Sequence, residues 1–187
     1  MSTVQITAFL LILGTGLTTI GFGIFPSRIY TSDNKQEKMN LLASKSERWV
    51  WSQLFVILGS ITSVVGSIFL FLAYRNGQVA IPIGIGLLLF VAGHVFWTWQ
   101  LVLRIVHPEM FAFNTLPAWL FRWYSILTLL GLVSYGFAFW LEGNYLVLGI
   151  GLVFASLLVL GLFLKFKGML PIVYYAMTLA VGITLLL

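Results

Sequence analysis

The chain contains no cysteine among its 187 residues. Disulfides, cysteine metal sites and thiol catalysis are therefore excluded. Charged residues are also scarce: they make up 8% of the chain, whereas a soluble domain carries about 25%. Only five residues are acidic, and none of them lies in a long apolar stretch. That pattern argues against transport coupled to protons or sodium through carboxylates inside a membrane.

Charge is missing altogether from six long stretches, each long enough to cross a bilayer as a helix of about 20 apolar residues. The stretches are residues 1–27, 49–74, 76–103, 123–141, 143–164 and 168–187. They predict an all-α fold, a polytopic integral membrane bundle of six transmembrane helices that forms a single transmembrane domain over residues 1–187. The helices are expected at about 4–25, 49–74, 79–103, 119–141, 145–164 and 168–187.

The basic residues are divided unevenly between the connections that join these helices. Nine of the ten lie in the connections 26–48, 104–122 and 165–167, which share one side of the membrane; only Arg75 lies on the other. Positive charge accumulates on cytoplasmic loops. We therefore expect a multi-pass protein of the cell membrane with cytoplasmic basic loops and with both the N- and C-termini on the non-cytoplasmic side. The net charge of +5 then reports orientation, and no nucleic-acid partner is expected.

The two longer cytoplasmic connections differ in composition. Residues 26–48 form the only strongly polar stretch; Thr31–Lys38 is expected to be a solvated loop, and Met39–Arg48 to add an interfacial helical turn. The connection 105–121 mixes polar residues and prolines with aromatic ones, as segments in the headgroup zone do. It is interpreted as a loop lying on the membrane, with a substrate gate as the alternative.

Small residues at four-residue spacing predict where helices pack together, because they let two backbones approach closely. Such pairs occur in the first, second and fifth predicted helices. The residues are Gly14, Thr18, Gly59, Ser63, Ser67, Gly151 and Ala155. They are expected to face helices of the same chain, or of other membrane subunits or a second copy of this chain.

The third predicted helix is the one candidate for a functional site, because polar groups recur along one face at 100° per residue. The candidate ligand-binding residues are His94, Trp97, Gln100, Arg104, His107 and Glu109. His94 is expected near mid-membrane, where an ionisable group is by default a functional hypothesis. The alternative is a structural histidine. Either way, it is predicted to bond to a neighbouring helix, with Ser60, Thr62 or Ser63 as partner, or to a ligand.

No metal or cofactor is predicted. Imidazole can ligate haem iron, but His94 and His107 lie thirteen residues apart on one helix, about 20 Å, and cannot hold one haem together. A haem or a lipophilic pigment would need a further partner. Two histidines with no cysteine and no Glu-x-x-His motif also argue against a zinc or di-iron site.

These features favour a small non-catalytic integral membrane protein that interacts with membrane lipids. It would be either a subunit of a membrane assembly or a binder of a lipid-like hydrophobic ligand. A small transporter with a cavity along the third helix is the alternative. A membrane-embedded enzyme that uses His94, or His107 with Glu109, is a further one.

Overall fold

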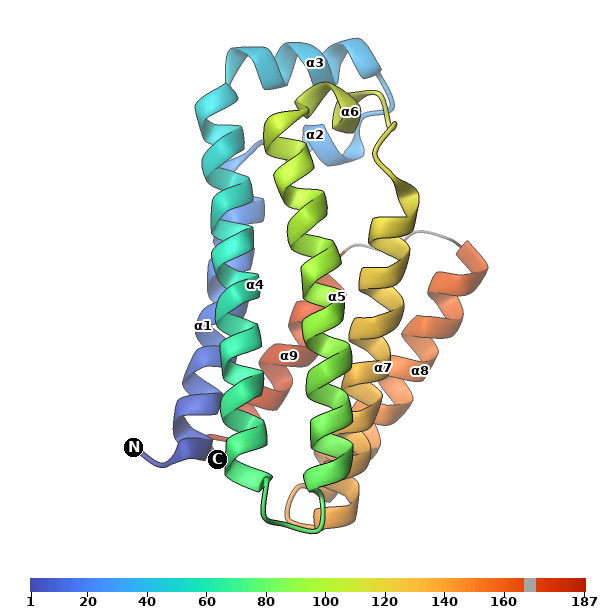
Figure 1. The fold of residues 1–187 in the computed structure, drawn as a ribbon. Helices are drawn as coiled ribbons and strands as arrows, with labels where there is room; N and C mark the ends of the chain where they lie inside the picture. The colour runs from blue at the N-terminus through green and yellow to red at the C-terminus, as the bar shows by residue number, and fades with distance from the viewer. Residues whose placement is uncertain (167–170) are drawn as a thin grey trace.

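The computed structural model describes residues 1–166 and 171–187, and every regular element within them is a helix (Figure 1). Five helices are long and apolar enough to cross a membrane. They are α1 (Thr3–Ile24), α4 (Ser46–Tyr74), α5 (Ala80–Val106), α7 (Ala118–Glu142) and α8 (Leu146–Phe166). The chain is an integral membrane protein built from these helices, and its outer surface agrees: Leu88, Val147 and Phe154 are 72%, 86% and 68% exposed.

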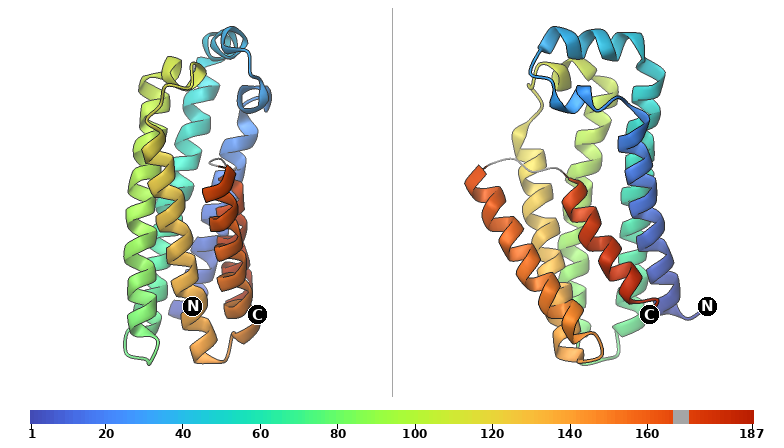
Figure 2. Two further views of the ribbon diagram at one scale, coloured as in Figure 1. Left: turned by 90° about the vertical axis from the view of Figure 1, so that its right-hand side faces the viewer. Right: turned by 180° about the vertical axis from the view of Figure 1, so that it is seen from behind.

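The last helix, α9 (Ile172–Thr184), is shorter than predicted. Its 13 residues extend about 20 Å, whereas the apolar core of a bilayer is about 30 Å thick. The first residues of the predicted helix, 168–170, lie outside the described part of the chain. α9 runs beside the half of α1 that is nearer the N-terminus (Figure 2). The predicted count of six spans is therefore not confirmed.

The long helices pack in an order that brings distant parts of the sequence together. α4 packs on α1 and α5, α5 packs on α7, and α7 packs on α8. α9 lies mainly against α1 and also contacts α7 and α8, which closes the bundle. The two short turns keep α4 beside α5 and α7 beside α8. Both turns and both termini lie towards the same end of the bundle (Figures 1 and 2).

The interface between α1 and α4 depends on the absence of side chains at two glycines. A Cβ added at Gly14 would lie 2.8 Å from the carbonyl oxygen of Gly59, and one added at Gly59 would lie 2.5 Å from the carbonyl oxygen of Gly14. Thr18 and Ser63 lie at the same contact. Ser52 on α4 adds a hydrogen bond of 2.7 Å from its hydroxyl to the carbonyl oxygen of Gly21. Close backbone approach therefore holds this pair of helices together.

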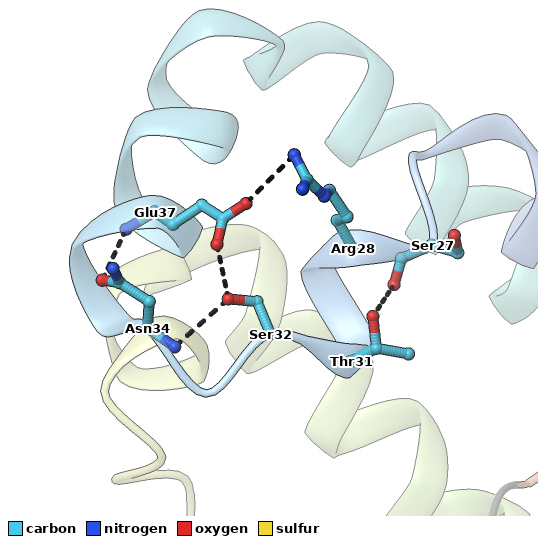
Figure 3. A network of polar contacts seen from close by, with 6 residues as sticks. All are labelled: Ser27, Arg28, Thr31, Ser32, Asn34 and Glu37. Atoms are coloured by element: carbon cyan, nitrogen blue, oxygen red, sulfur yellow. Dashed lines mark hydrogen bonds and ion pairs between the residues drawn. The ribbon is translucent and has the colours of Figure 1, made fainter.

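Three short helices cover the end of the bundle opposite the termini and form what we call the cap. They are α2 (Arg28–Thr31), α3 (Lys35–Ser44) and α6 (Pro108–Ala112). The expectation of a solvated loop over Thr31–Lys38 is wrong at its second half, because α3 already begins at Lys35. Asn34 caps that helix: its side-chain oxygen accepts hydrogen bonds from the backbone N–H groups of Gln36 and Glu37. Figure 3 shows the contact with Glu37.

The cap has a small apolar core of its own. The two predicted cytoplasmic connections contribute to it together, because α3 and α6 contact each other. Tyr30 and Phe111, one from each connection, meet edge to face at 6.0 Å between ring centres. The buried members of this core are Phe25, Ile29, Leu42, Trp49 and Ala112. A few apolar side chains in otherwise polar segments are thus enough to fold both connections into one layer.

Candidate ligand site

The predicted polar stripe of α5 divides between three environments. Trp97, Gln100 and Arg104 are buried in the half of the bundle nearer the cap, at 0%, 6% and 8% exposure. His94 is also buried, near the middle of α5. His107 ends the helix instead, on the surface, where its Nδ1 lies 3.2 Å from the Glu109 carboxylate. The stripe therefore does not form one site.

His94 turns into the bundle, but its hydrogen bond differs from the predicted one. Its Nδ1 lies 2.9 Å from the backbone carbonyl oxygen of Phe90, on its own helix, rather than from a hydroxyl of α4. A carbonyl only accepts hydrogen bonds, so Nδ1 carries the proton and donates it. Nε2 is then left with a free lone pair. Within the described residues, Nε2 has no hydrogen-bond donor of its own.

Aromatic rings fix the plane of the His94 imidazole. It lies 4.1 Å from the Phe90 ring, measured between centres, and meets the rings of Tyr124 and Tyr175 at right angles, at 5.7 Å and 6.4 Å. These neighbours come from three helices, α5, α7 and α9. The imidazole is therefore held in one orientation before any ligand arrives.

A groove of about 280 Å³ opens on the outer surface between α4 and α5, and His94 lies at its base. Apolar side chains form most of the walls; Ile61 and Val95, at the rim, are 50% and 58% exposed. The lining residues are Ser60, Ile61, Val64, Val65, Val91, His94, Val95 and Thr98. The groove thus combines an apolar entrance that faces lipid with a polar base at Ser60 and His94.

A tyrosine from the far end of the sequence lies behind this base. The Tyr175 hydroxyl is 2.7 Å from the Ser60 hydroxyl, in a buried hydrogen bond that joins α9 to α4. Thr18, Tyr124 and Trp97 lie around the same hydroxyl. Tyr124 in turn stacks on Trp97, with 4.8 Å between ring centres. These contacts keep the Ser60 hydroxyl and the His94 ring in fixed relation to each other.

Sequence reasoning considered Ser60 only as a partner of His94 and missed Tyr124 and Tyr175. The available signal was the presence of tyrosine well inside apolar stretches, because a buried phenol usually finds a hydrogen-bond partner. Nothing in the local sequence of α9 indicates that it reaches α4. Only the packing of α9 against α1 brings Tyr175 to the groove.

The predicted packing residues fall into two groups. Gly14, Thr18, Gly59 and Ser63 meet between α1 and α4, and Ser67 is buried beside Tyr135 of α7. Gly151, in contrast, is exposed, with open space where a Cβ would lie, and Ala155 is half-buried one turn further on. On α8 it is Gly149 that makes the close approach, to Gly136 of α7. The contact predicted for Gly151 within the chain therefore belongs to Gly149.

Nothing in the described part of the chain gathers three or more histidine, aspartate or glutamate side chains around a possible metal ion. His94 is the one imidazole at the groove, since His107 lies at the cap end of α5. Comparison with protein-family models, with curated proteins and with solved structures gives no match.

Proposed function

We propose that the protein binds a small lipophilic molecule in the groove between α4 and α5. The observation that carries this proposal is the free Nε2 lone pair of His94 at the base of an apolar groove that faces lipid. An acceptor that opens to an apolar groove without a donor costs free energy, about 1–3 kcal/mol by analogy with other orphaned polar groups. A ligand hydroxyl or N–H donated to Nε2 would remove that cost.

The position of His94 limits the chemistry of the ligand. It lies near the middle of α5, and therefore far from either membrane surface. A phospholipid headgroup is unsuitable at this depth, because a charged group there would be costly to bury. The groove instead suits a molecule that lies wholly within the apolar layer and carries one uncharged donor group, such as a long-chain or isoprenoid alcohol.

Two alternatives receive less support from the geometry. A transporter needs a passage, yet the interior space beside Ser67 and Tyr135, in the described part of the bundle, is about 10 Å³. That volume holds no more than about one water molecule. The enzyme alternative is not favoured by the positions of its residues. His107 and Glu109 pair at 3.2 Å, but they lie on the exposed surface at the cap end of α5, whereas His94 lies alone near the middle of that helix. Assembly with other subunits or with itself stays a prediction from the sequence.

Photolabelling tests the proposal with a matched pair of probes. One is a long-chain alcohol carrying a diazirine and an alkyne; the other is its methyl ether, which cannot donate a hydrogen bond. We expect the alcohol to label residues of the groove, such as Ile61 and Val95, at least about fivefold more efficiently than the ether, since leaving the Nε2 acceptor without a donor costs about 1–3 kcal/mol.

Two variants and one control make the result specific. Val91→Phe fills the groove and His94→Leu removes the acceptor, so both should abolish the preference for the alcohol. Val147→Phe changes an equally apolar side chain on the outer face of α8. Val147 is 86% exposed, so this control should preserve the preference for the alcohol. Equal labelling by both probes, or labelling spread evenly over the lipid-facing surface, would contradict the proposal.

A further inference from the structure

Two cationic side chains are buried in the cap region without a carboxylate partner. Arg104, in the last turn of α5, is 8% exposed, and Lys38, on α3, is 7% exposed. Neither makes an ion pair within the described residues, which include all five acidic side chains of the protein. Lysine and arginine are almost never this buried unless they are paired. The Arg104 Nε is buried without a hydrogen-bond partner, so this guanidinium lacks the negative charge that such burial calls for. Lys38 adds a second positive charge with a largely buried stem.

None of the acidic residues of the cap, all of which the structure describes, forms an ion pair with Arg104 or Lys38. Glu37 lies 3.6 Å from the Arg28 guanidinium and accepts a 2.7 Å hydrogen bond from the Ser32 hydroxyl (Figure 3). Glu109 faces His107. Glu47 is exposed at the start of α4 and has no ion pair in the described structure. The compensating charge must therefore come from outside the chain.

The two cations share one aromatic neighbour, the Phe111 ring. The Arg104 guanidinium carbon lies 4.9 Å from the centre of the Phe111 ring and 5.1 Å from that of Trp97. The Lys38 ammonium lies 5.8 Å from the same Phe111 ring. Trp49 fixes the backbone here, because its indole N–H donates a 2.8 Å hydrogen bond to the Arg104 carbonyl oxygen. Four helices thus position this pair: α3, α4, α5 and α6.

This arrangement suits a phosphate. A phosphate binds a guanidinium through two parallel N–H groups. The Trp97 and Phe111 rings contact the Arg104 guanidinium without accepting conventional hydrogen bonds from it, so its N–H groups are the part left for a ligand. Lysine then supplies a second point charge. The contact also lies at the end of the bundle, at the level of the membrane surface, well away from the groove at His94.

We propose that Arg104 and Lys38 bind a phosphate group, and that the phosphate belongs to the headgroup of an anionic lipid in the leaflet on the cap side. The headgroup would lie at the edge of the guanidinium, beside Phe111. Its acyl chains would extend along the apolar outer surface of the bundle. This site is separate from the groove, so each proposal can fail without the other.

The test uses the purified full-length protein in a neutral detergent and follows thermal unfolding while a short-chain lipid is added. Dioctanoyl phosphatidylglycerol is compared with dioctanoyl phosphatidylcholine, which has a phosphate but no net charge, and with inorganic phosphate alone. We expect phosphatidylglycerol to bind at least about tenfold more tightly than phosphatidylcholine. Both lipids carry the phosphate, but the choline ammonium of phosphatidylcholine offsets the phosphate charge and is repelled by Arg104 and Lys38. Stabilisation by inorganic phosphate alone to the same degree would support the anion site but assign it to free phosphate.

Variants of the two cations decide whether this preference arises at the proposed site. Arg104→Gln and Lys38→Gln should each weaken phosphatidylglycerol binding about tenfold or more. The matched controls Lys35→Gln and Arg122→Gln remove exposed charges near the same membrane surface. They should change the affinity for phosphatidylglycerol by less than about twofold. Should Arg104→Gln fail to fold, Lys38→Gln and the lipid preference of the unaltered protein still decide the matter. No preference for phosphatidylglycerol, or equal losses in all four variants, would overturn the proposal.

Discussion

At the scale of single residues, His94 shows how a helix can hold an unused acceptor inside a membrane. The hydrogen bond to Phe90 comes from the preceding turn of the same helix, so the imidazole needs no partner helix to satisfy Nδ1. The sequence placed His94 in the interior, because a polar side chain facing lipid is costly. It could not predict the direction of Nδ1, since a hydroxyl on α4 and a carbonyl on α5 are both within reach of a histidine at this position.

Replacing His94 by leucine should have little effect on folding. The lost hydrogen bond lies within one helix, and hydrogen bonds in membranes are worth about 0.6 kcal/mol on average. Leucine also keeps apolar contact with Phe90. We expect the free energy of unfolding in mixed detergent micelles to change by less than about 1 kcal/mol. A loss of more than about 3 kcal/mol, compared with the exposed control His107→Leu, would show that His94 has a structural role instead.

At the scale of elements, α1 and α4 form the most extensive helix–helix contact in the described part of the bundle. The spacing of Gly14, Thr18, Gly59 and Ser63 could be read from the sequence, but not which helix each would face. On α8 the same reasoning selected Gly151, which faces outward, and passed over Gly149. Small residues four positions apart line up on whichever face of a helix they occupy. Their spacing alone therefore cannot distinguish a face that packs inside the bundle from one that faces outward.

A pair of alanine substitutions on α1 tests the α1–α4 contact. A Cβ at position 14 would lie 2.8 Å and 2.9 Å from backbone atoms of Gly59 and Ser63, whereas one at position 16 meets nothing within 4 Å. Gly14→Ala should therefore destabilise the protein by about 1–3 kcal/mol, the usual cost of overpacking. Gly16→Ala should be neutral or stabilising by up to about 1 kcal/mol, because alanine favours the helix. Equal effects in an unfolding titration would refute the contact.

The cap is the element that sequence reasoning described least well. Its helices are short, and most of the segment 26–48 is polar. The few apolar side chains that fold it, such as Ile29 and Leu42, become informative only once α6 supplies Ala112 and Phe111 opposite them. Such a small core depends on contacts between distant segments, and local composition does not reveal them.

At the scale of the whole molecule, the predicted bundle of apolar helices agrees with the structure, apart from the short α9. Which end faces the cytoplasm is an expectation from the basic residues. The absence of cysteine makes this easy to test, because a single introduced thiol is the only one in the chain. With a membrane-impermeant maleimide, Asn76→Cys in the α4–α5 turn should react in intact cells. Gln36→Cys in the cap should react only after the cells are permeabilised, and the opposite pattern would reverse the orientation.

The most direct test of the central proposal is native mass spectrometry of the protein released from its own membrane. The account predicts a bound molecule that is uncharged, has a single polar donor group and is lighter than a phospholipid. It should be present in the unaltered protein and in the control Val147→Phe, and absent from Val91→Phe and much reduced in His94→Leu. A protein that carries no such molecule, or carries it equally in all four forms, would contradict the assignment of the α4–α5 groove as a ligand site.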